Sequence, residues 1–358
     1  MKRSTIHIAP ALPRPSRDVH APAVISVTAL AGVSAMVRHA FGDKVLRLAK
    51  QAAKLDIERI EDQECFIPQT TMIRFLNEIE RRSGEPHLGL LIAPHLSLGR
   101  YGRWGEYVLS GETLGAAIAR AASTLGYHST GDRMDYAADR GVARVSYYNA
   151  TRGQAGYAQV SSATAGVLVS LLRAYLGADL QLRTVELDIP APRAATLFED
   201  TFSCPVVFDA PAVSVSFAEH LFDRPLGAGA PSRWLTFEDV ARARARTEPA
   251  DLGSLLGVLS EQIRAQVLAG AVSIDSAARG IGISVRSLQR SLQREGADFR
   301  QLVNLIRAQR AKELLGESAA SITEIATAFG YSSPANFARA FRKATGKTPQ
   351  EFRATRRR

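Results

Sequence analysis

The sequence predicts an α+β N-terminal domain followed by an all-α C-terminal domain, in which a long helix joins two helix-turn-helix units. Three observations lead to this prediction. The chain has 358 residues, which is enough for two or three domains. Strand-like alternation of apolar and polar residues ends before residue 251, and only helical periodicity follows. One helix-turn-helix pattern then occurs twice before the C-terminus.

The predicted elements of the N-terminal part follow from hydrophobic periodicity. Helical spacing covers most of 33–93, with Pro68 at the start of one helix, and the spacing loosens at 100–111. The later elements are expected to be a helix at 113–125, strands at 133–137 and 142–148, a long helix at 155–176, a strand at 182–189, a helix at 193–202, and strands at 206–208 and 213–217.

Charge is distributed unevenly along the chain. The predicted parts are a mobile tail at 1–22, an N-terminal domain at 23–230, a linker at 231–250 and a C-terminal domain at 251–358. The net charge is +10, and the last of these parts carries 17 Lys and Arg against 9 Asp and Glu, whereas the first 250 residues carry 28 against 26. A basic domain attached to a nearly neutral one is typical of proteins that bind nucleic acid.

Composition excludes several other classes of protein. Hydrophobic residues make up 46% and charged residues 22%, which excludes a disordered or fibrous protein. The two cysteines, Cys65 and Cys204, form no C-x-x-C pair, which excludes a disulfide scaffold or a cysteine-rich zinc module. The uncharged runs at 21–37 and 153–172 are short or interrupted by polar residues, so we expect a buried core helix in each rather than a membrane span. These features predict a cytoplasmic protein without a membrane partner.

The first helix-turn-helix copy covers 274–292. A short helix ends at a glycine-bearing turn, and Ser284 is placed to cap the second helix. Leu288 and Leu292 face the core, while Arg286, Ser287, Gln289, Arg290 and Gln293 provide polar groups on the exposed side. A recognition helix in the DNA major groove needs this combination of an apolar back and hydrogen-bonding groups at the front.

The second copy covers 322–343, with Ser333 as the cap and Phe337 and Phe341 on the buried side. A helix at 298–316, roughly 25 Å long, joins the two copies and could hold their second helices about one DNA turn apart. The candidate base contacts are Arg290 and Arg339. The complete predicted DNA-binding set is Ser284, Arg286, Ser287, Gln289, Arg290, Gln293, Ser333, Ala335, Asn336, Arg339, Arg342, Lys343 and Lys347, of which Arg342, Lys343 and Lys347 are expected to contact phosphates.

The residues at 310–315, 322–341 and 346–353 resemble the C-terminal signature of AraC-type transcriptional regulators. The resemblance implies that Arg286, Gln289 and Arg290 occupy base-facing positions of the first recognition helix. In the second helix these positions fall on Pro334, Ala335, Asn336 and Arg339. The first two cannot donate side-chain hydrogen bonds, so we expect this helix to contribute mostly phosphate contacts and a thymine-methyl contact from the alanine.

Residues 24–226 resemble the arabinose-binding-like N-terminal domain of one branch of this family, through Pro94-His95, Gly99-Arg100-Tyr101-Gly102, Leu114-Gly115, Cys204 to Phe208 and Leu221 to Leu226. The resemblance implies sensing of a small effector or self-association, and does not establish a sugar ligand. Aromatic and polar residues suited to a pocket lining are Arg100, Tyr101, Trp104, Tyr107, Tyr127 and His128. The alternative, that these are ordinary core and surface residues, stays open.

We therefore predict a sequence-specific DNA-binding transcriptional regulator that responds to a small-molecule effector and is not an enzyme. Double-stranded DNA and the effector are the expected partners, with RNA polymerase and a second copy of the chain as further candidates. No metal-ligand spacing, nucleophile elbow or phosphate-binding loop is found, and no cofactor is expected. Two alternatives remain: a DNA-bound alkyl-transfer enzyme that uses Cys65 or Cys204, and an architectural DNA binder without an effector.

Overall fold

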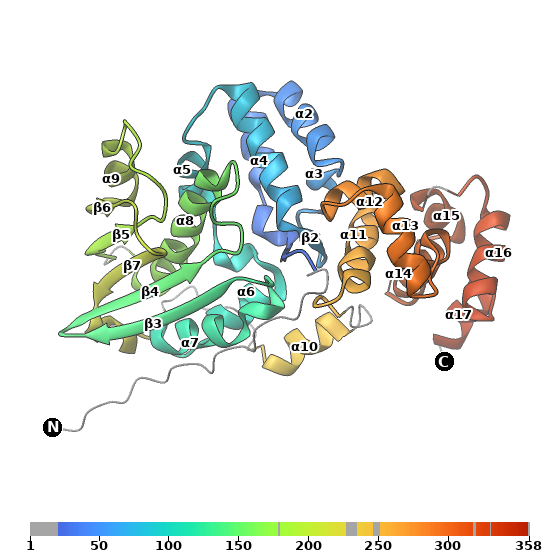
Figure 1. Cartoon of the computed structure of the whole chain (residues 1–358). Coiled ribbons are helices and arrows are strands. Elements are labelled where there is room, and N and C mark those ends of the chain that lie inside the picture. The colour runs from blue at the N-terminus through green and yellow to red at the C-terminus, as the bar shows by residue number, and fades with distance from the viewer. Residues whose placement is uncertain are drawn as a thin grey trace.

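The computed structural model describes residues 21–177, 180–226, 235–245, 251–317, 320–329 and 331–356. Almost all of the predicted tail, and the linker at 231–234 and 246–250, lie outside these residues. Figure 1 shows a sheet and its covering helices at one end of the molecule and a purely helical part at the other. Within the described residues, no helix combines the length and the apolar character that crossing a membrane requires.

The N-terminal part contains a five-stranded sheet with the order β3-β4-β7-β5-β6. Neighbouring strands within the sheet run antiparallel, except β5 and β6, which are parallel. The turn between β3 and β4 places Arg140 and Gly141 at positive φ, as a two-residue hairpin with the twist of its strands requires. The strands are β3 (Arg133–Asp139), β4 (Val142–Tyr148), β5 (Thr184–Glu186), β6 (Val206–Val207) and β7 (Val213–Ala218).

Helix α8 (Tyr157–Leu176) packs on the sheet through β7 and continues the core toward the other helices. It lies so close to the neighbouring turn that a Cβ on Gly166 would come within 2.6 Å of the Ala93 Cα atom. The remaining helices of this part are α1 (Val33–Phe41), α2 (Asp43–Ala53), α3 (Ile57–Ile60), α4 (Gln69–Ser83), α5 (Leu88–Ile92), α6 (Gly102–Leu109), α7 (Leu114–Thr124) and α9 (Thr196–Phe202).

The structure corrects the prediction of a core helix in 21–37. This run forms the strand β1 (Val24–Ser26) and a 3₁₀ helix (Val27–Leu30), and a helix begins only at α1, after Gly32 adopts φ 86°. Strand β1 pairs antiparallel with β2 (Phe66–Pro68), so a distant segment decides its conformation. The predicted helix in 153–172 is confirmed as α8, whereas α6 lies where periodicity indicated none.

The C-terminal part is helical throughout its described residues, and together with the mixed sheet this confirms the predicted fold class. This part has its own apolar core, the second core of the molecule. It contains Val258, Ile263, Leu288, Phe337 and Phe341, which come from both helix-turn-helix units and the helix before them. Helix α14 runs through the middle of this part and contacts α11, α15, α16 and α17. The helices are α10 (Phe237–Ala245), α11 (Leu255–Ala269), α12 (Ile274–Gly280), α13 (Val285–Arg294), α14 (Phe299–Glu317), α15 (Ile322–Ala328), α16 (Pro334–Thr345) and α17 (Pro349–Arg356).

Candidate nucleic-acid interface and effector cavity

The two helix-turn-helix units close their turns with equivalent backbone hydrogen bonds. In the unit formed by α12 and α13, the Ile283 N–H donates to the Ala278 carbonyl at 3.0 Å. In the unit formed by α15 and α16, the Tyr331 N–H donates to the Ala326 carbonyl, also at 3.0 Å. Both bonds join residues five apart, so the two turns return the chain in the same way.

Serine side chains start the second helix of each unit. The Ser284 hydroxyl accepts from the Ser287 N–H at 3.1 Å, and the Ser333 hydroxyl accepts from the Asn336 N–H at 3.2 Å. Each cap satisfies one backbone donor at the end of a helix, which the helix itself cannot do. The serines expected to start these helices do so, and their hydroxyls are therefore engaged within the protein.

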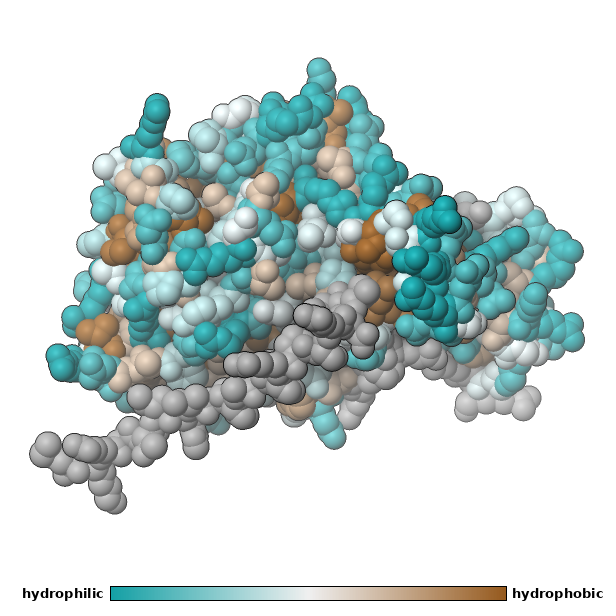
Figure 2. Space-filling view, in the orientation of Figure 1, coloured by the Kyte–Doolittle hydropathy of each residue, from teal (hydrophilic) through white to brown (hydrophobic). Residues whose placement is uncertain are grey.

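Helix α13 separates an apolar back from an open polar front. Leu288 and Leu292 are buried in the second core. On the other side, the side chains of four exposed residues make no hydrogen bond or ion pair within the described part of the chain: Arg286, Gln289, Arg290 and Gln293. These groups are free to bind an external partner, and Figure 2 shows hydrophilic side chains gathered over α13.

Helix α16 has a similar back but a more occupied front. Phe337 and Phe341 are buried, with ring centroids 5.8 Å apart. The half-buried Asn336 donates to the Ser332 hydroxyl at 2.7 Å and accepts a hydrogen bond from Arg339. The remaining predicted contacts of this unit are exposed: Ala335, Arg342, Lys343 and Lys347.

The N-terminal part holds the first unit directly. From α4, the Arg74 guanidinium donates to the carbonyls of Arg279 and Gly280 at 2.7 and 3.3 Å, and the Thr70 hydroxyl donates to the Gly280 carbonyl at 3.0 Å. These carbonyls end α12, where the helix dipole favours a cation. One helix of the N-terminal part therefore fixes the first helix of the first unit.

Helix α11 lies between the two parts and contributes to both apolar cores. Ile263 packs in the C-terminal core, whereas Ala265 belongs to the N-terminal one. The helix packs against β2 and α3, and it buries the polar side chains Glu261, Gln262 and Gln266. Neither amide atom of Gln262 has a hydrogen-bond partner among the described residues. A buried polar layer of this kind makes the contact weaker than an apolar core of equal area.

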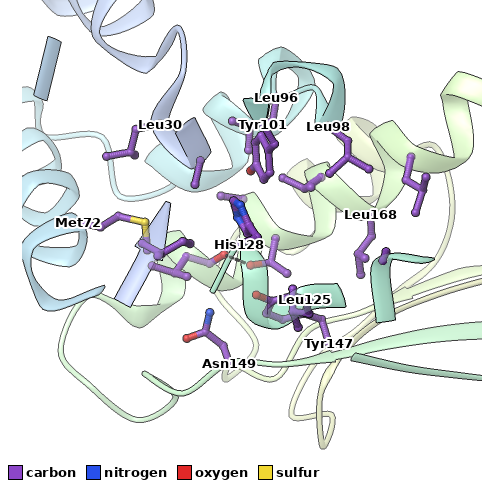
Figure 3. Close-up of a pocket in the computed structure, with 18 of the residues that line it drawn as sticks. Leu30, Met72, Leu96, Leu98, Tyr101, Leu125, His128, Tyr147, Asn149 and Leu168 are labelled. Carbon is purple, nitrogen blue, oxygen red and sulfur yellow. Dashed lines mark hydrogen bonds between the residues drawn. The ribbon is translucent and has the colours of Figure 1, made fainter. Parts of the chain in front are cut away.

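A cavity lies inside the N-terminal part, with a volume of about 90 Å³. Its walls are mainly apolar and come from the 3₁₀ helix at 27–30, α4, α7 and α8 and from the turns around α5 and α6 (Figure 3). Six of its apolar lining residues are Leu30, Met72, Leu96, Leu98, Leu125 and Leu168. Among the residues that the structure describes, the lining contains no Asp, Glu, Lys or Arg.

His128 is the central polar residue of the cavity. Its ring stacks against Tyr101 and Trp104, with centroids 4.8 and 4.6 Å away and both rings inclined by 16°. The side chain is 3% exposed, and this burial lowers the pKa of His128 to about 3, so the imidazole is neutral near pH 7. Its Nδ1 atom has no hydrogen-bond partner in the described structure, and its backbone carbonyl accepts from the Ser26 N–H of β1 at 2.7 Å.

Of the six residues suggested for a ligand pocket, three line the cavity and three do not. Tyr101, Trp104 and His128 line the cavity. Arg100 is outside this lining, and its guanidinium lies against Gly32.

The other two of the six contact α10. The Phe237 ring lies 6.2 Å from the Tyr107 ring and 5.1 Å from the Tyr127 ring, measured between centroids. Sequence reasoning did not single out Met72, Tyr147 or Asn149, which also line the cavity. No local pattern marks these residues, because they come from separate elements.

Both cysteines are buried thiols. Cys65 is fully buried and Cys204 is 8% exposed. Burial raises the pKa of each thiol, which keeps both protonated near neutral pH. A nucleophilic cysteine requires the opposite, a lowered pKa and access to its substrate.

Comparisons with known proteins agree with this architecture. Residues 44–226 match the family model described as the arabinose-binding domain of AraC transcription regulator, and residues 277–355 match a helix-turn-helix domain. The chain is 28% identical over 273 residues to the ornithine utilization regulator of Pseudomonas aeruginosa, covering 75% of this chain and 79% of that protein.

Two further relatives come from the same organism. The HTH-type transcriptional regulator VqsM is 29% identical over 200 residues, which is 54% of this chain and 58% of VqsM. The crystal structure of the transcriptional regulator CdpR is 22% identical, with a TM-score of 0.40 over 87% of this chain and 97% of CdpR. The arabinose-binding match alone spans slightly more than half of the 358 residues. The chain therefore belongs to the AraC family, as a DNA-binding transcriptional regulator with an arabinose-binding-like effector domain.

Proposed function

We propose that α13 and α16 bind two adjacent major-groove segments of promoter DNA, and that a small molecule in the cavity controls this binding. The observation that carries the proposal is the pair of serine-capped helices with exposed polar fronts, joined by α14. The two functional units are 23–230 and 251–358, connected by 231–250, in a cytoplasmic protein. A second copy of the chain and RNA polymerase are the further partners that a promoter-bound regulator would meet.

Different side chains in this interface have different tasks. The Arg290 guanidinium has the geometry to donate two hydrogen bonds to a guanine edge, and it makes no hydrogen bond or ion pair with the described residues, which supports this role. Arg339, oriented by Asn336, is the corresponding candidate on α16. Arg342 and Lys343, near the end of α16, together with Lys347 beyond it, are assigned to phosphates, which contribute affinity but no base discrimination.

Two elements connect the cavity to the DNA-binding part. Met72 on α4 lines the cavity, while Arg74 on the same helix holds the end of α12. On β1, Ile25 lines the cavity and its neighbour Val24 packs in the C-terminal core. A ligand that shifts α4 moves the residues that hold the end of α12, and one that shifts β1 alters the packing of Val24 in the C-terminal core. Both connections support effector control rather than a purely architectural role.

Both buried thiols support a regulator rather than an alkyl-transfer enzyme. Cys65→Ser and Cys204→Ser are expected to leave sequence-specific DNA binding and promoter output unchanged, since neither thiol is accessible as a nucleophile. Loss of promoter output in either variant, with DNA binding intact, would favour the alkyl-transfer enzyme instead.

The first test is selection of bound genomic fragments by the purified full-length protein at about 150 mM salt, where phosphate contacts alone give weak binding. We expect enrichment of fragments that share two short boxes about one helical turn apart. Uniform recovery of all fragments, decreasing steeply with added salt, would contradict sequence reading by these helices.

A further inference from the structure

We propose that the cavity binds an uncharged, largely apolar molecule whose few hydrogen-bonding groups meet His128 and Tyr101, rather than a sugar or an amino acid. This inference rests on the proposed effector control and identifies the chemical class of the effector. It follows from three properties of the cavity: the absence of charge in its described lining, the small number of free polar groups, and its size.

The lining provides no counter-ion for a charged ligand. It contains no acidic or basic side chain among the described residues, and Arg100 lies outside it. His128 does not replace a cation, because its burial favours the neutral imidazole. Transfer of a carboxylate or an ammonium group into such surroundings loses its hydration without a compensating ion pair. An amino acid carries both groups, so this cavity disfavours it.

Most polar atoms of the lining are already engaged within the protein. The Trp104 indole N–H donates to the Thr124 hydroxyl at 2.9 Å, and the Tyr147 hydroxyl donates to Asp132 at 2.6 Å. The Thr164 hydroxyl donates to the carbonyl one turn earlier on α8, at 2.8 Å. A sugar would place several hydroxyl groups against these walls, where few of them find partners.

Three polar groups remain for a ligand. They are the His128 imidazole, the Tyr101 hydroxyl and the Asn149 amide nitrogen, for which the described structure contains no hydrogen-bond partner. Figure 3 shows Tyr101 and His128 close together, while Asn149 lies at another edge of the cavity. A neutral imidazole both donates and accepts, so it can bind a hydroxyl, carbonyl or amine of a neutral ligand. The cavity volume of about 90 Å³ is several times the roughly 10–15 Å³ that one water molecule needs, so the cavity has room for a small organic molecule.

The test uses two fluorescent probes that differ by one charge. N-phenyl-1-naphthylamine is neutral, and 8-anilinonaphthalene-1-sulfonate has the same ring systems with a sulfonate added. The full-length protein carries Trp234→Phe, so that Trp104 in the cavity wall is its one tryptophan. We expect saturable binding of the neutral probe with energy transfer from Trp104, binding of the sulfonate at least about tenfold weaker, and no displacement by millimolar arabinose or ornithine.

Two variants on α8 locate the bound probe. Ala163→Phe fills the cavity and should weaken binding of the neutral probe at least tenfold, whereas Ala158→Phe places the same ring on the exposed side of the helix and should not. Thermal unfolding shows whether each variant is folded. The comparison of the two probes on the parent protein requires neither variant.

The results separate this inference from the proposed function. Tighter binding of the sulfonate, displacement by arabinose or ornithine, or no uptake of the neutral probe would each overturn the assigned ligand class. If selective recovery of DNA fragments persists in those cases, the proposed function stands without this ligand class. If selective recovery fails, the proposed function fails whatever the probes show.

Discussion

The two helix-turn-helix units have the same internal construction but different neighbours. Each turn is closed by an equivalent backbone hydrogen bond, and each second helix begins at a serine cap. The first unit is held by Arg74 and Thr70 of the N-terminal part, whereas the second lies at the far end of the molecule (Figure 1). The first unit is therefore placed to receive a displacement directly from the cavity-bearing part.

The exposed fronts of α13 and α16 differ as well. On α13, Arg286, Gln289, Arg290 and Gln293 make no side-chain hydrogen bond or ion pair with the described residues. In contrast, α16 begins with Pro334 and Ala335, and Arg339 donates a hydrogen bond to Asn336. The two units therefore share their local structure but differ in how their exposed polar groups are engaged. On our proposal, the first unit reads sequence and responds to the effector, and the second mainly fixes the protein on the DNA backbone. The predictions below test that division.

The largest expected effect is on the stability of the second unit. Phe341 is 1% exposed and its ring meets that of Phe352 at a centroid distance of 5.7 Å, so Phe341→Ala should lower the free energy of unfolding by about 3–5 kcal/mol. Urea denaturation measures this loss. Leu305→Ala, at an exposed position of α14, is the control and should change stability by less than about 0.5 kcal/mol. A loss below about 1 kcal/mol for Phe341→Ala would show that α16 is not anchored through this ring.

The next effect concerns base reading by the first unit. Arg290→Ala should weaken binding to the selected DNA site by about 1–3 kcal/mol and relax the preference at one base position. Arg339→Ala should change sequence preference less. Titration of the selected site and its single-base variants measures both. Arg300→Ala removes one positive charge at an exposed position of α14 and serves as the control. Equal weakening on all sequences would make Arg290 a phosphate contact.

Salt dependence then tests the second unit. Arg342→Ala should reduce the slope of log binding constant against log salt concentration by about one unit, because one phosphate contact is lost. Sequence preference should stay the same. Arg47→Ala, on the exposed side of α2, should leave the slope unchanged. An unaltered slope in Arg342→Ala would remove this residue from the DNA contacts.

The smallest expected effect is at the contact between the two parts. Arg74→Ala removes a cation from the C-terminal end of α12, which should lower the local free energy of opening of α12 by about 0.5–1 kcal/mol. Hydrogen exchange of the α12 amides measures this change. Arg81→Ala, on the same helix but paired with Glu78, provides the control. Equal exchange in the parent protein and Arg74→Ala would mean that the contact does not hold the first unit.

Local sequence signals were most accurate for elements whose ends are marked by a helix cap or a tight turn. Ser284 and Ser333 mark the start of their helices, and the turn at Arg140 and Gly141 separates β3 from β4. Helix α6 was not predicted, because it has only about two turns and contains a glycine. Gly105 allows close packing there, since a Cβ at this position would collide with the Leu98 carbonyl.

The family, the repeated helix-turn-helix unit and the residues on its exposed fronts could be predicted from the sequence, because caps and helical periodicity act within one or two turns of the chain. The pairing of β1 with β2, the contact of Arg74 with α12 and the cavity around His128 depend on how distant segments pack in the folded chain. The lining of that cavity runs from Ile25 to Leu171 along the chain. Burial, and with it the neutral state of His128, arises where such distant residues pack together, which no local pattern records.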